Sequence, residues 1–375
     1  MMHRGLYMKR FIKKVIQRMT KDVLVEIIPP EKNKELSCEK AERILQEHHP
    51  DVFSSPICKN KVHDKKYDLT VIVPVYNVEK YLHRCMDSLR NQQTKYTYHV
   101  VAINDGSTDR SGDILATYSG WADLKVINQK NRGFSGARNT GLQEVLGRFV
   151  MFVDSDDYLS ENAVESLLAA AYFRDADIVQ GGYVRVTENE KKQFGGVKYC
   201  DASGVAPNGV LAGMAWGKVY KAELFSGICF PEGYWYEDSI ITGIVTHLAA
   251  RIATISDNVY FYRTNAMGIT QTSRGKPKSI DTFYVLRSTL NARKQLGMKT
   301  DCAFYEHLLR IIPLCTQRTQ NEPEQVQRAM FVLIKKMLQE QRGNSGFEVH
   351  DRYKKLERVI LCGDFRKYRL LCDVS

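Results

Sequence analysis

Three carboxylates follow directly on an apolar run in the middle of the chain. The run Val150–Val153 leads into Asp154, Asp156 and Asp157. A buried strand would deliver these carboxylates at its C-terminal end, which is where open α/β sheets bind ligands. Clustered carboxylates repel one another unless a cation joins them, and a divalent ion bound by one or two of them keeps positions free for phosphate oxygens. The segment therefore predicts a site for a metal-bound diphosphate in which Asp156 is a metal ligand.

Side chains that suit a nucleotide precede this segment. Tyr76 offers a ring face for a flat base, and Asp105 can accept a hydrogen bond from a ring N–H. Arg138 can pair with a phosphate or contact the base. A single Asp at a strand end is more often a helix cap than a ligand. Four such features in order along the chain, these three residues and Asp156, are hard to explain as capping alone. Asp157 is the exception, because its place before an expected helix at 159–168 favours a capping role.

Alternating strands and helices are expected to position these residues. A continuous apolar, β-branched run predicts a buried strand at 69–75, and further strands are expected at 99–103, 124–127 and 149–153. Apolar spacing predicts helices between them, at 78–91, 111–118 and 135–144. After the carboxylates we expect a helix at 163–173, strands at 178–184 and 259–262, and helices from 280 onward. This pattern predicts an α/β fold with a doubly wound, mostly parallel sheet, whose strand ends form one cleft.

The ordered set of motifs resembles the family 2 glycosyltransferases, which have the GT-A fold. The resemblance covers residues 68–272, and its matching stretches are 69–77, 104–109, 131–141 and 154–157. It implies an inverting transferase that uses a nucleotide-activated sugar, usually a uridine diphosphate (UDP) sugar. It also implies Mn²⁺ or Mg²⁺ as the cofactor, bound at the DXD motif that begins at Asp154.

The resemblance assigns the binding of the nucleotide residue by residue. Pro74, Tyr76 and Asp105 would hold the uracil. Asn131 and Arg138 would flank the nucleotide. These assignments agree with the chemistry expected of the same positions from their side chains.

Four further positions complete the implied donor site. Asp154 and Ser155 would contact the ribose or the donor sugar, and Asp156 would bind the metal ion that bridges the two phosphates. Arg263 would stabilise the charge that develops on the leaving diphosphate. The basic loop at 274–278 follows it and can add charge or close over the site, although a solvated loop at a domain joint would have the same composition.

Inverting transfer needs one general base that deprotonates the acceptor hydroxyl. In the family, an acidic pair at the position of Glu237 and Asp238 carries this base, usually on its second residue. The resemblance thus implies Asp238 as the base and Glu237 as a positioning residue, while the alternative is an acidic helix N-terminus. Trp216, Trp235 and Tyr236 are candidates to stack on the acceptor sugar, but aromatic residues at such spacing are as often part of a core.

The chain extends beyond the resemblance on both sides. We expect three parts: a basic N-terminal extension at 1–67, a GT-A domain at 68–272 and a helical region at 273–375. Residues 1–21 contain seven Lys and Arg and no acidic residue, with apolar residues at helical spacing. Two interpretations stay open for them: an amphipathic helix on an anionic membrane surface, or a helix that packs on its own domain.

Composition limits the compartment and the partners. The chain is 43% hydrophobic and 26% charged, as in soluble globular proteins, and no apolar run approaches the ~20 residues that span a bilayer. The nine cysteines include no C-x-x-C pair, which favours reduced thiols and a cytoplasmic protein, peripheral on the inner membrane face if residues 1–21 bind lipid. A net charge of +11 predicts an anionic partner, but no nucleic-acid-binding motif is present.

The predicted function is transfer of a sugar from a UDP-sugar to a hydroxyl of a saccharide or lipid-linked acceptor. We expect this reaction to serve the synthesis of a bacterial-type surface polysaccharide or glycoconjugate. The alternative is a non-catalytic relative that keeps the nucleotide cleft as a scaffold, against which the presence of Asp156 and Asp238 argues. The sequence leaves open the donor sugar, the acceptor, the linkage, the metal and the oligomeric state.

Overall fold

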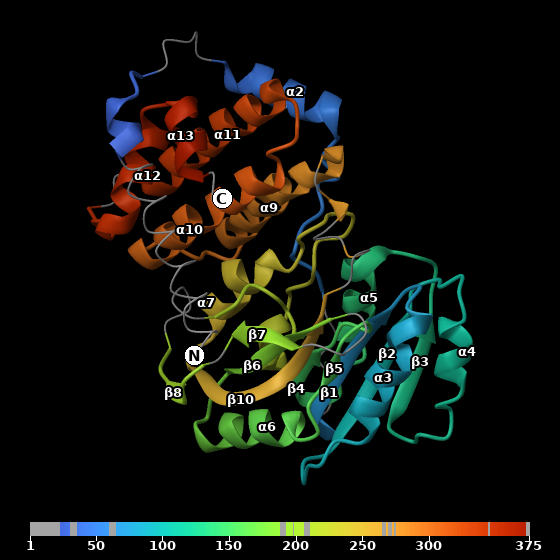
Figure 1. Cartoon of the computed structure of the whole chain (residues 1–375). Helices are drawn as coiled ribbons and strands as arrows, with labels where there is room; N and C mark the ends of the chain where they lie inside the picture. Colours follow the sequence, from blue (N-terminus) through green and yellow to red (C-terminus); the bar gives the residue numbers. More distant parts are fainter. Residues whose placement is uncertain are drawn as a thin grey trace, which may run out of the picture. The chain divides into compact units, whose positions relative to one another are not determined.

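The computed structural model forms two compact units, each described separately below (Figure 1). The sheet unit consists of residues 52–272 and 284–298, and the helical unit consists of residues 1–51, 273–283 and 299–375. The described residues are 23–30, 36–59, 65–187, 193–197, 199–205, 211–264, 268, 272–273, 275–343 and 346–372. The candidate membrane helix at 1–21 and Arg274 lie outside them. The three-part division expected from the sequence stays a prediction.

One mixed sheet forms the centre of the sheet unit, with the strand order β3-β2-β1-β4-β9-β6-β10-β5. Its first four strands in sequence are parallel neighbours: β1 (Tyr67–Val75), β2 (Tyr98–Asn104), β3 (Leu124–Asn128) and β4 (Gly147–Phe152). The others are β5 (Tyr158–Leu159), β6 (Ile178–Val186), β7 (Gln193–Val197), β8 (Ala202–Ser203), β9 (Lys218–Lys221) and β10 (Ile252–Arg263). β6 and β10 are also parallel, whereas β9 is antiparallel to β4 and β6.

Helices cover both faces of this sheet, as the alternation along the chain predicts. They are α3 (Glu79–Arg90), α4 (Ser111–Ala116), α5 (Gly133–Leu142), α6 (Ala163–Phe173) and α7 (Thr246–Leu248), with a 3₁₀ helix at Ala222–Phe225 and a π-helix at Ile241–Val245. Successive residues of β1 point to opposite faces, so Val71 and Val73 pack in one buried cluster with α3 and α6. Ile72 packs in the other cluster with α5. The predicted α/β fold is confirmed.

The helical unit contains α2 (Cys38–His48), α10 (Cys302–Arg318), α11 (Glu324–Arg342), α12 (Asp351–Leu361) and α13 (Phe365–Cys372), with a 3₁₀ helix at Pro277–Ile280. α9 (Asp281–Gln295) begins in this unit and continues in the sheet unit. The Asp301 carboxylate caps α10 by accepting from Phe304 N at 2.8 Å. Glu322 is almost fully buried and accepts hydrogen bonds from Ser279 Oγ and His48 Nε2, which ties three segments together. The helical character expected from residue 280 onward is confirmed.

None of the helices in the described part of the chain has the length and apolar character needed to cross a bilayer.

Candidate active site

The strand ends that the sequence selects do meet at one edge of the sheet. In the parallel ladder, Val75 of β1 lies opposite Asn104 of β2, and Asp105 N donates to Val75 O at 2.9 Å. On the other side of β1, Val153 N donates to Ile72 O at 3.0 Å, directly before Asp154. Tyr76, Asp105 and Asp154 therefore leave neighbouring strands at the same end, as predicted.

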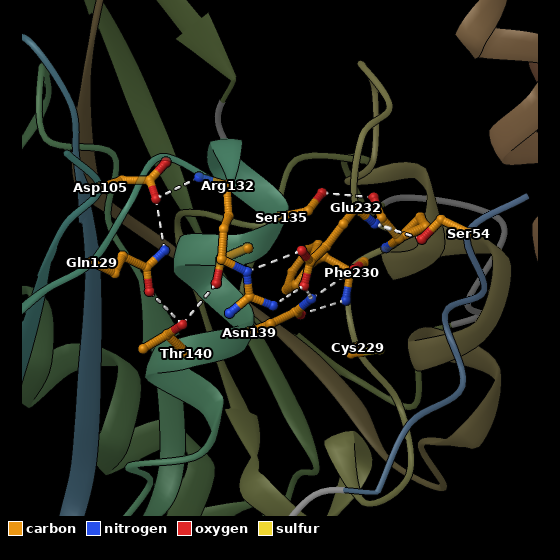
Figure 2. A network of polar contacts seen from close by, with 12 residues as sticks. Ser54, Asp105, Gln129, Arg132, Ser135, Asn139, Thr140, Cys229, Phe230 and Glu232 are labelled. Atoms are coloured by element: carbon orange, nitrogen blue, oxygen red, sulfur yellow. Dashed lines mark hydrogen bonds and ion pairs between the residues drawn. The ribbon is translucent and has the colours of Figure 1, made fainter. Parts of the chain in front are cut away.

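Asp105 is held in a fixed orientation at the end of β2 (Figure 2). It is 2% exposed, and its Oδ1 accepts from Gln129 Nε2 at 2.6 Å and from Arg132 N at 2.9 Å. Gly106 follows with φ +74, and a Cβ there would lie 3.0 Å from Asn131 N, so the two loops can approach only because this residue is glycine. A carboxylate fixed by two donors suits recognition of a ring N–H.

The other expected nucleotide contacts differ in their exposure. The Tyr76 ring is 46% exposed and offers a free face, whereas Pro74 is buried within β1. Asn131 Oδ1 accepts from Gly133 N at 3.2 Å at the start of α5. Of these three residues, Tyr76 is the most exposed, and contact of all three with a nucleotide stays a prediction.

Asp157 does not cap the following helix, which contradicts that interpretation of the sequence. Its Oδ1 accepts from Arg263 N at 2.7 Å and its Oδ2 accepts from the Tyr260 hydroxyl at 2.8 Å, both on β10. α6 begins at Ala163, after a short β5 that the sequence did not reveal. The carboxylate binds β10 because the turn 154–157 packs under that strand, so Asp157 ties the turn to the sheet.

Three carboxyl groups gather in this turn. Burial raises the pKa of Asp157 well above its usual value, and the charges of Asp156 and Asp154 raise it further. Ser155 is buried, while Asp154 and Asp156 are half-buried. No group of three or more His, Cys, Asp or Glu in the described ranges is arranged to enclose a metal ion by itself. Oxygen ligands that repel one another do suit a divalent cation that takes its remaining ligands from a diphosphate.

Arg263 lies beneath the turn. It is 2% exposed, its Nε donates to Asp156 O at 2.8 Å, and its guanidinium carbon lies 4.7 Å from the centre of the Tyr81 ring. This buried position suits a group that holds the turn and supplies positive charge behind it. Direct contact with a phosphate, as the resemblance implies, stays a prediction.

A buried bridge formed by Arg138 joins the donor carboxylates to the acidic pair. Arg138 is 4% exposed; its Nη2 donates to Asp154 Oδ1 at 2.9 Å and its Nη1 to Glu237 Oε1 at 2.5 Å. Burial acts to lower its pKa, but the charges of Asp154, Glu237 and Asp238 outweigh it and raise the pKa above the usual value. Burial raises the pKa of Glu237, against the effect of Arg138. The bridge brings the DXD segment and the acidic pair together, which the sequence alone did not show.

The acidic pair lies in a turn that leads directly into a helical segment at 239–248, part of which is a π-helix, so the alternative of an acidic helix N-terminus stays open. Tyr236 has φ +65, an unusual conformation for a bulky residue, and its carbonyl accepts from Ser239 N and Oγ. Asp238 O accepts from Ile241 N at 2.9 Å, where the π-helix begins. The Trp235 and Tyr236 rings are half-buried and meet edge to face at 6.5 Å. Both rings retain exposed surface for an acceptor.

Trp216 is mainly a core residue. It is 6% exposed and stacks on Tyr260 at 4.4 Å and on Tyr262 at 5.3 Å between ring centres. This packing favours the interpretation of Trp216 as a core residue. Contact of Trp216 with an acceptor sugar stays a prediction, and little of its surface is exposed for it.

A second network of polar contacts, around α5, was missed by the sequence analysis (Figure 2). Asn139 Nδ2 donates to Phe230 O and Asn139 Oδ1 accepts from Phe230 N, both at 2.8 Å. Arg132 binds the Glu232 carboxylate through Nε and Nη2, and Ser135 Oγ donates to Pro231 O at 2.8 Å. The network fixes residues 230–232, which lead into the acidic pair, to the helix that starts beside Asp105. No signal in the sequence separates these polar residues from ordinary helix surface.

Comparison with known proteins identifies the type of domain. Residues 70–209 match the family model described as glycosyl transferase family 2. The chain is 33% identical over 261 residues to glycosyltransferase GlyA of Streptococcus pneumoniae. The aligned region covers 65% of this chain and 37% of GlyA. The chain is also 31% identical over 205 residues to the poly(ribitol-phosphate) β-N-acetylglucosaminyltransferase TarS of Staphylococcus aureus, covering 53% of this chain and 36% of TarS.

Solved structures show the same fold. The crystal structure of S. aureus TarS residues 1–349 in complex with UDP-GlcNAc superimposes with a TM-score of 0.63 at 22% identity, covering 81% of this chain and 90% of that one. These structures confirm the expected fold. The family match confirms the resemblance of the motifs where it applies: residues 70–209 form a glycosyl transferase family 2 domain.

Proposed function

We propose that this protein transfers a sugar from a UDP-sugar to an acceptor hydroxyl with inversion at the anomeric carbon. The observation that carries the proposal is the Arg138 bridge. It places the DXD segment, where the donor diphosphate is expected, beside the acidic pair, where the base is expected.

The donor is bound at the ends of β1, β2 and β4 in this proposal. Tyr76 stacks on the uracil, and the fixed carboxylate of Asp105 accepts from the uracil N–H. Ser155 and Asp154 lie toward the ribose and sugar. TarS has been crystallised in complex with UDP and with UDP-GlcNAc, so UDP-GlcNAc is the first donor to test here.

Asp156, with help from Asp154, is proposed to hold Mn²⁺ or Mg²⁺ together with the diphosphate. The residues fit such an ion because they supply charged oxygens and leave most coordination positions to the phosphates. When bound, the ion neutralises charge on the departing diphosphate. Arg263 holds the Asp156 backbone from below and adds positive charge.

Asp238 is proposed as the general base. The acceptor oxygen attacks the anomeric carbon, its proton passes to Asp238, and the bond from the anomeric carbon to the β-phosphate oxygen breaks to release UDP. Glu237 is locked by Arg138 and fixes the backbone that carries Asp238. Trp235 and Tyr236, which are half-buried and directly precede the acidic pair, are the proposed ring contacts of the acceptor sugar.

The charge distribution supports an anionic partner outside the transferase domain. Residues 68–272 contain 19 Lys and Arg against 23 Asp and Glu, whereas residues 1–67 contain 15 against 9 and residues 273–375 contain 20 against 11. The positive charge of the protein therefore resides in its flanks. We propose that they hold a saccharide or lipid-linked acceptor at the inner membrane face, with residues 1–21 as a peripheral contact.

Calorimetric titration with UDP, GDP, ADP and a panel of UDP-sugars, with and without Mn²⁺, tests the proposal. We expect metal-dependent binding of UDP in preference to the other nucleotides, and slow release of UDP from one UDP-sugar when water is the acceptor. Folded protein that binds none of them would contradict the proposal. Donor binding without any turnover would favour the scaffold alternative.

A further inference from the structure

Lys218 is a buried cation that the reaction described above does not use. It is the first residue of β9, and its side chain is 0% exposed. A lysine is almost never fully buried unless it is paired, because removing an ammonium group from water costs free energy. Specific interactions must therefore stabilise it at this place.

Its ammonium group binds the segment that precedes its own strand. Nζ donates to Met214 O at 2.6 Å and to Trp216 O at 3.4 Å. Tyr220, on the same strand, donates its hydroxyl to Ala215 O at 2.8 Å. Gly217 has φ +72, which lets the chain turn back into β9. Two side chains of β9 thus tie residues 214–216 into a compact loop.

This loop supports the turn that carries the donor carboxylates. The Trp216 ring stacks on Tyr260 at 4.4 Å with an interplanar angle of 9°. The Tyr260 hydroxyl accepts from Asp154 N at 3.1 Å and donates to Asp157 Oδ2 at 2.8 Å. A displacement of residues 214–216 would therefore reach Asp154 through two contacts.

Lys218 also lies within the electrostatic reach of the proposed base. Burial lowers the pKa of Lys218 to about 7, and the negative charge of Asp238 raises it. Burial, and then the charge of Asp238, raise the pKa of Tyr220 on the same strand. Asp238 is the charged group that acts on Lys218 among the described residues. The charge of Asp238 thus acts on two buried basic groups, Lys218 and Arg138.

We propose that Lys218 is a positioning residue for the transfer step. Its ammonium group fixes the loop at 214–216, and with it the Trp216 ring and the donor turn, and its positive charge favours the carboxylate form of Asp238. The proposal rests on the proposed function, because it gives Lys218 a part in the reaction of Asp238.

The substitution Lys218→Met removes the charge and keeps the length of the side chain. Lys221→Met is the matched control, because Lys221 belongs to the same strand and its Nζ pairs with Asp177 Oδ1 at 2.6 Å. The assay is UDP release from UDP-GlcNAc and the other UDP-sugars, with UDP affinity measured by calorimetry. For Lys218→Met we expect kcat to fall about 10- to 100-fold, the usual cost of losing a supporting group behind a reactive one. UDP affinity should fall less than kcat, because Arg263 still holds the donor turn through Asp157 and Asp156. Lys221→Met should keep its turnover.

The pH profile distinguishes this role from a general loss of packing. In the wild type, kcat should decline as the pH rises through about 7, where Lys218 loses its proton, and Lys218→Met should lack that step. If Lys218→Met does not fold, Lys218→Gln provides the same readouts with a neutral donor. If the wild type turns over a UDP-sugar and the Lys218 variant shows the same kcat and the same pH profile, the proposed role of Lys218 is overturned, while the proposed function stands. Absence of nucleotide binding and turnover in the wild type would overturn the proposed function as well.

Discussion

The proposed donor side and the proposed acceptor side of the candidate site are built in different ways. The donor side consists of β1 to β4 and the loops after them, where regular parallel strands bring Asp105 and Asp154 to one edge. The acceptor side consists of residues 211–245, where the backbone is irregular and charged side chains are buried. Tyr236 has φ +65, a π-helix follows at Ile241–Val245, and Lys218 is completely buried.

The two sides therefore position their side chains by different means. On the donor side, the regular hydrogen bonding of parallel strands brings residues at the strand ends to one edge of the sheet. The acceptor side depends on contacts between distant residues, such as the ion pair of Arg138 with Glu237, which lie 99 positions apart. Unusual backbone and buried charge lower stability and persist where the surroundings enforce them, often at functional sites. We therefore expect substitutions on the acceptor side to affect turnover more than donor binding.

The largest effect is expected for the substitution Asp238→Asn. Loss of the base should lower kcat for UDP release by about 10²- to 10⁴-fold, the usual contribution of a general base. The affinity for UDP should not change, because the donor side stays intact. Steady-state kinetics and calorimetry on the same preparation measure both quantities. Turnover at the wild-type rate would remove Asp238 as the base.

The next effect concerns stability and the bridge between the two sides. Arg138→Met leaves the Asp154 and Glu237 carboxylates without their buried cation, so the free energy of unfolding should fall by about 3–5 kcal/mol. Arg132→Met is the matched control, since the side chains of Arg132 and Glu232 are 50% and 35% exposed. It should cost about 0–1 kcal/mol. Urea unfolding compares the two variants. Equal losses of unfolding free energy would show that the buried Arg138 bridge stabilises the fold no more than an exposed ion pair.

The two sides should also respond to pH in different windows. On the donor side, burial lowers the pKa of His99 to about 4 from 6.5, and its Nε2 lies 2.8 Å from Thr70 Oγ1. Because the unfolded chain binds the proton first, stability should fall as the pH drops from about 6.5 toward about 4, by at most about 1.4 kcal/mol per pH unit. His99→Gln should remove this slope, whereas a slope unchanged in the variant would assign it to other groups.

On the proposed acceptor side, the free energy of unfolding should continue to change with pH above neutrality. The pKa of Lys218 is lowered to about 7 from 10.5, so the unfolded chain holds this proton while the folded chain releases it. The penalty of a buried ammonium group is therefore greatest at low pH, and stability should rise between about pH 7 and 10.5. Lys218→Met should flatten this part of the curve of unfolding free energy against pH. A rise of the same size in the variant would show that Lys218 is not its source.

The smallest effect is expected at the exposed ring of the donor side. Tyr76→Ala removes a stacking surface for the base and should weaken UDP binding by about tenfold, equivalent to ~1.4 kcal/mol. Tyr76→Phe keeps the ring and should bind UDP as the wild type does. Calorimetry with UDP decides between them, and normal affinity in the alanine variant would show that the ring does not contact the base.

The sequence was sufficient to predict the parallel half of the sheet and the strand ends at its edge. Continuous apolar runs such as Leu69–Val75 mark buried strands, and polar residues after them must lie at the sheet edge. The four-residue strand β9, inserted between β4 and β6, was not foreseen because so short a run gives no periodic signal. Its buried Lys218 could have drawn attention, since it stands in the otherwise apolar stretch 214–220.

The side-chain partners of the site could not be predicted for a physical reason. Arg138 was expected at the nucleotide on the strength of its chemistry, but its two amino groups are occupied by carboxylates 16 and 99 positions away. Asp157 was wrongly interpreted as a cap because its hydrogen-bond donors, the Tyr260 hydroxyl and the Arg263 backbone N–H, lie more than 100 positions further on. Such pairs depend on tertiary folding and leave no local pattern.

The stereochemistry of sugar release tests the central claim most directly. UDP-GlcNAc has the α configuration, and a single displacement assisted by Asp238 inverts it. Proton NMR of the first sugar released by the wild type, from whichever UDP-α-sugar it turns over, should show the β anomer before mutarotation. The α anomer as the first product would contradict a single displacement by a base-activated acceptor.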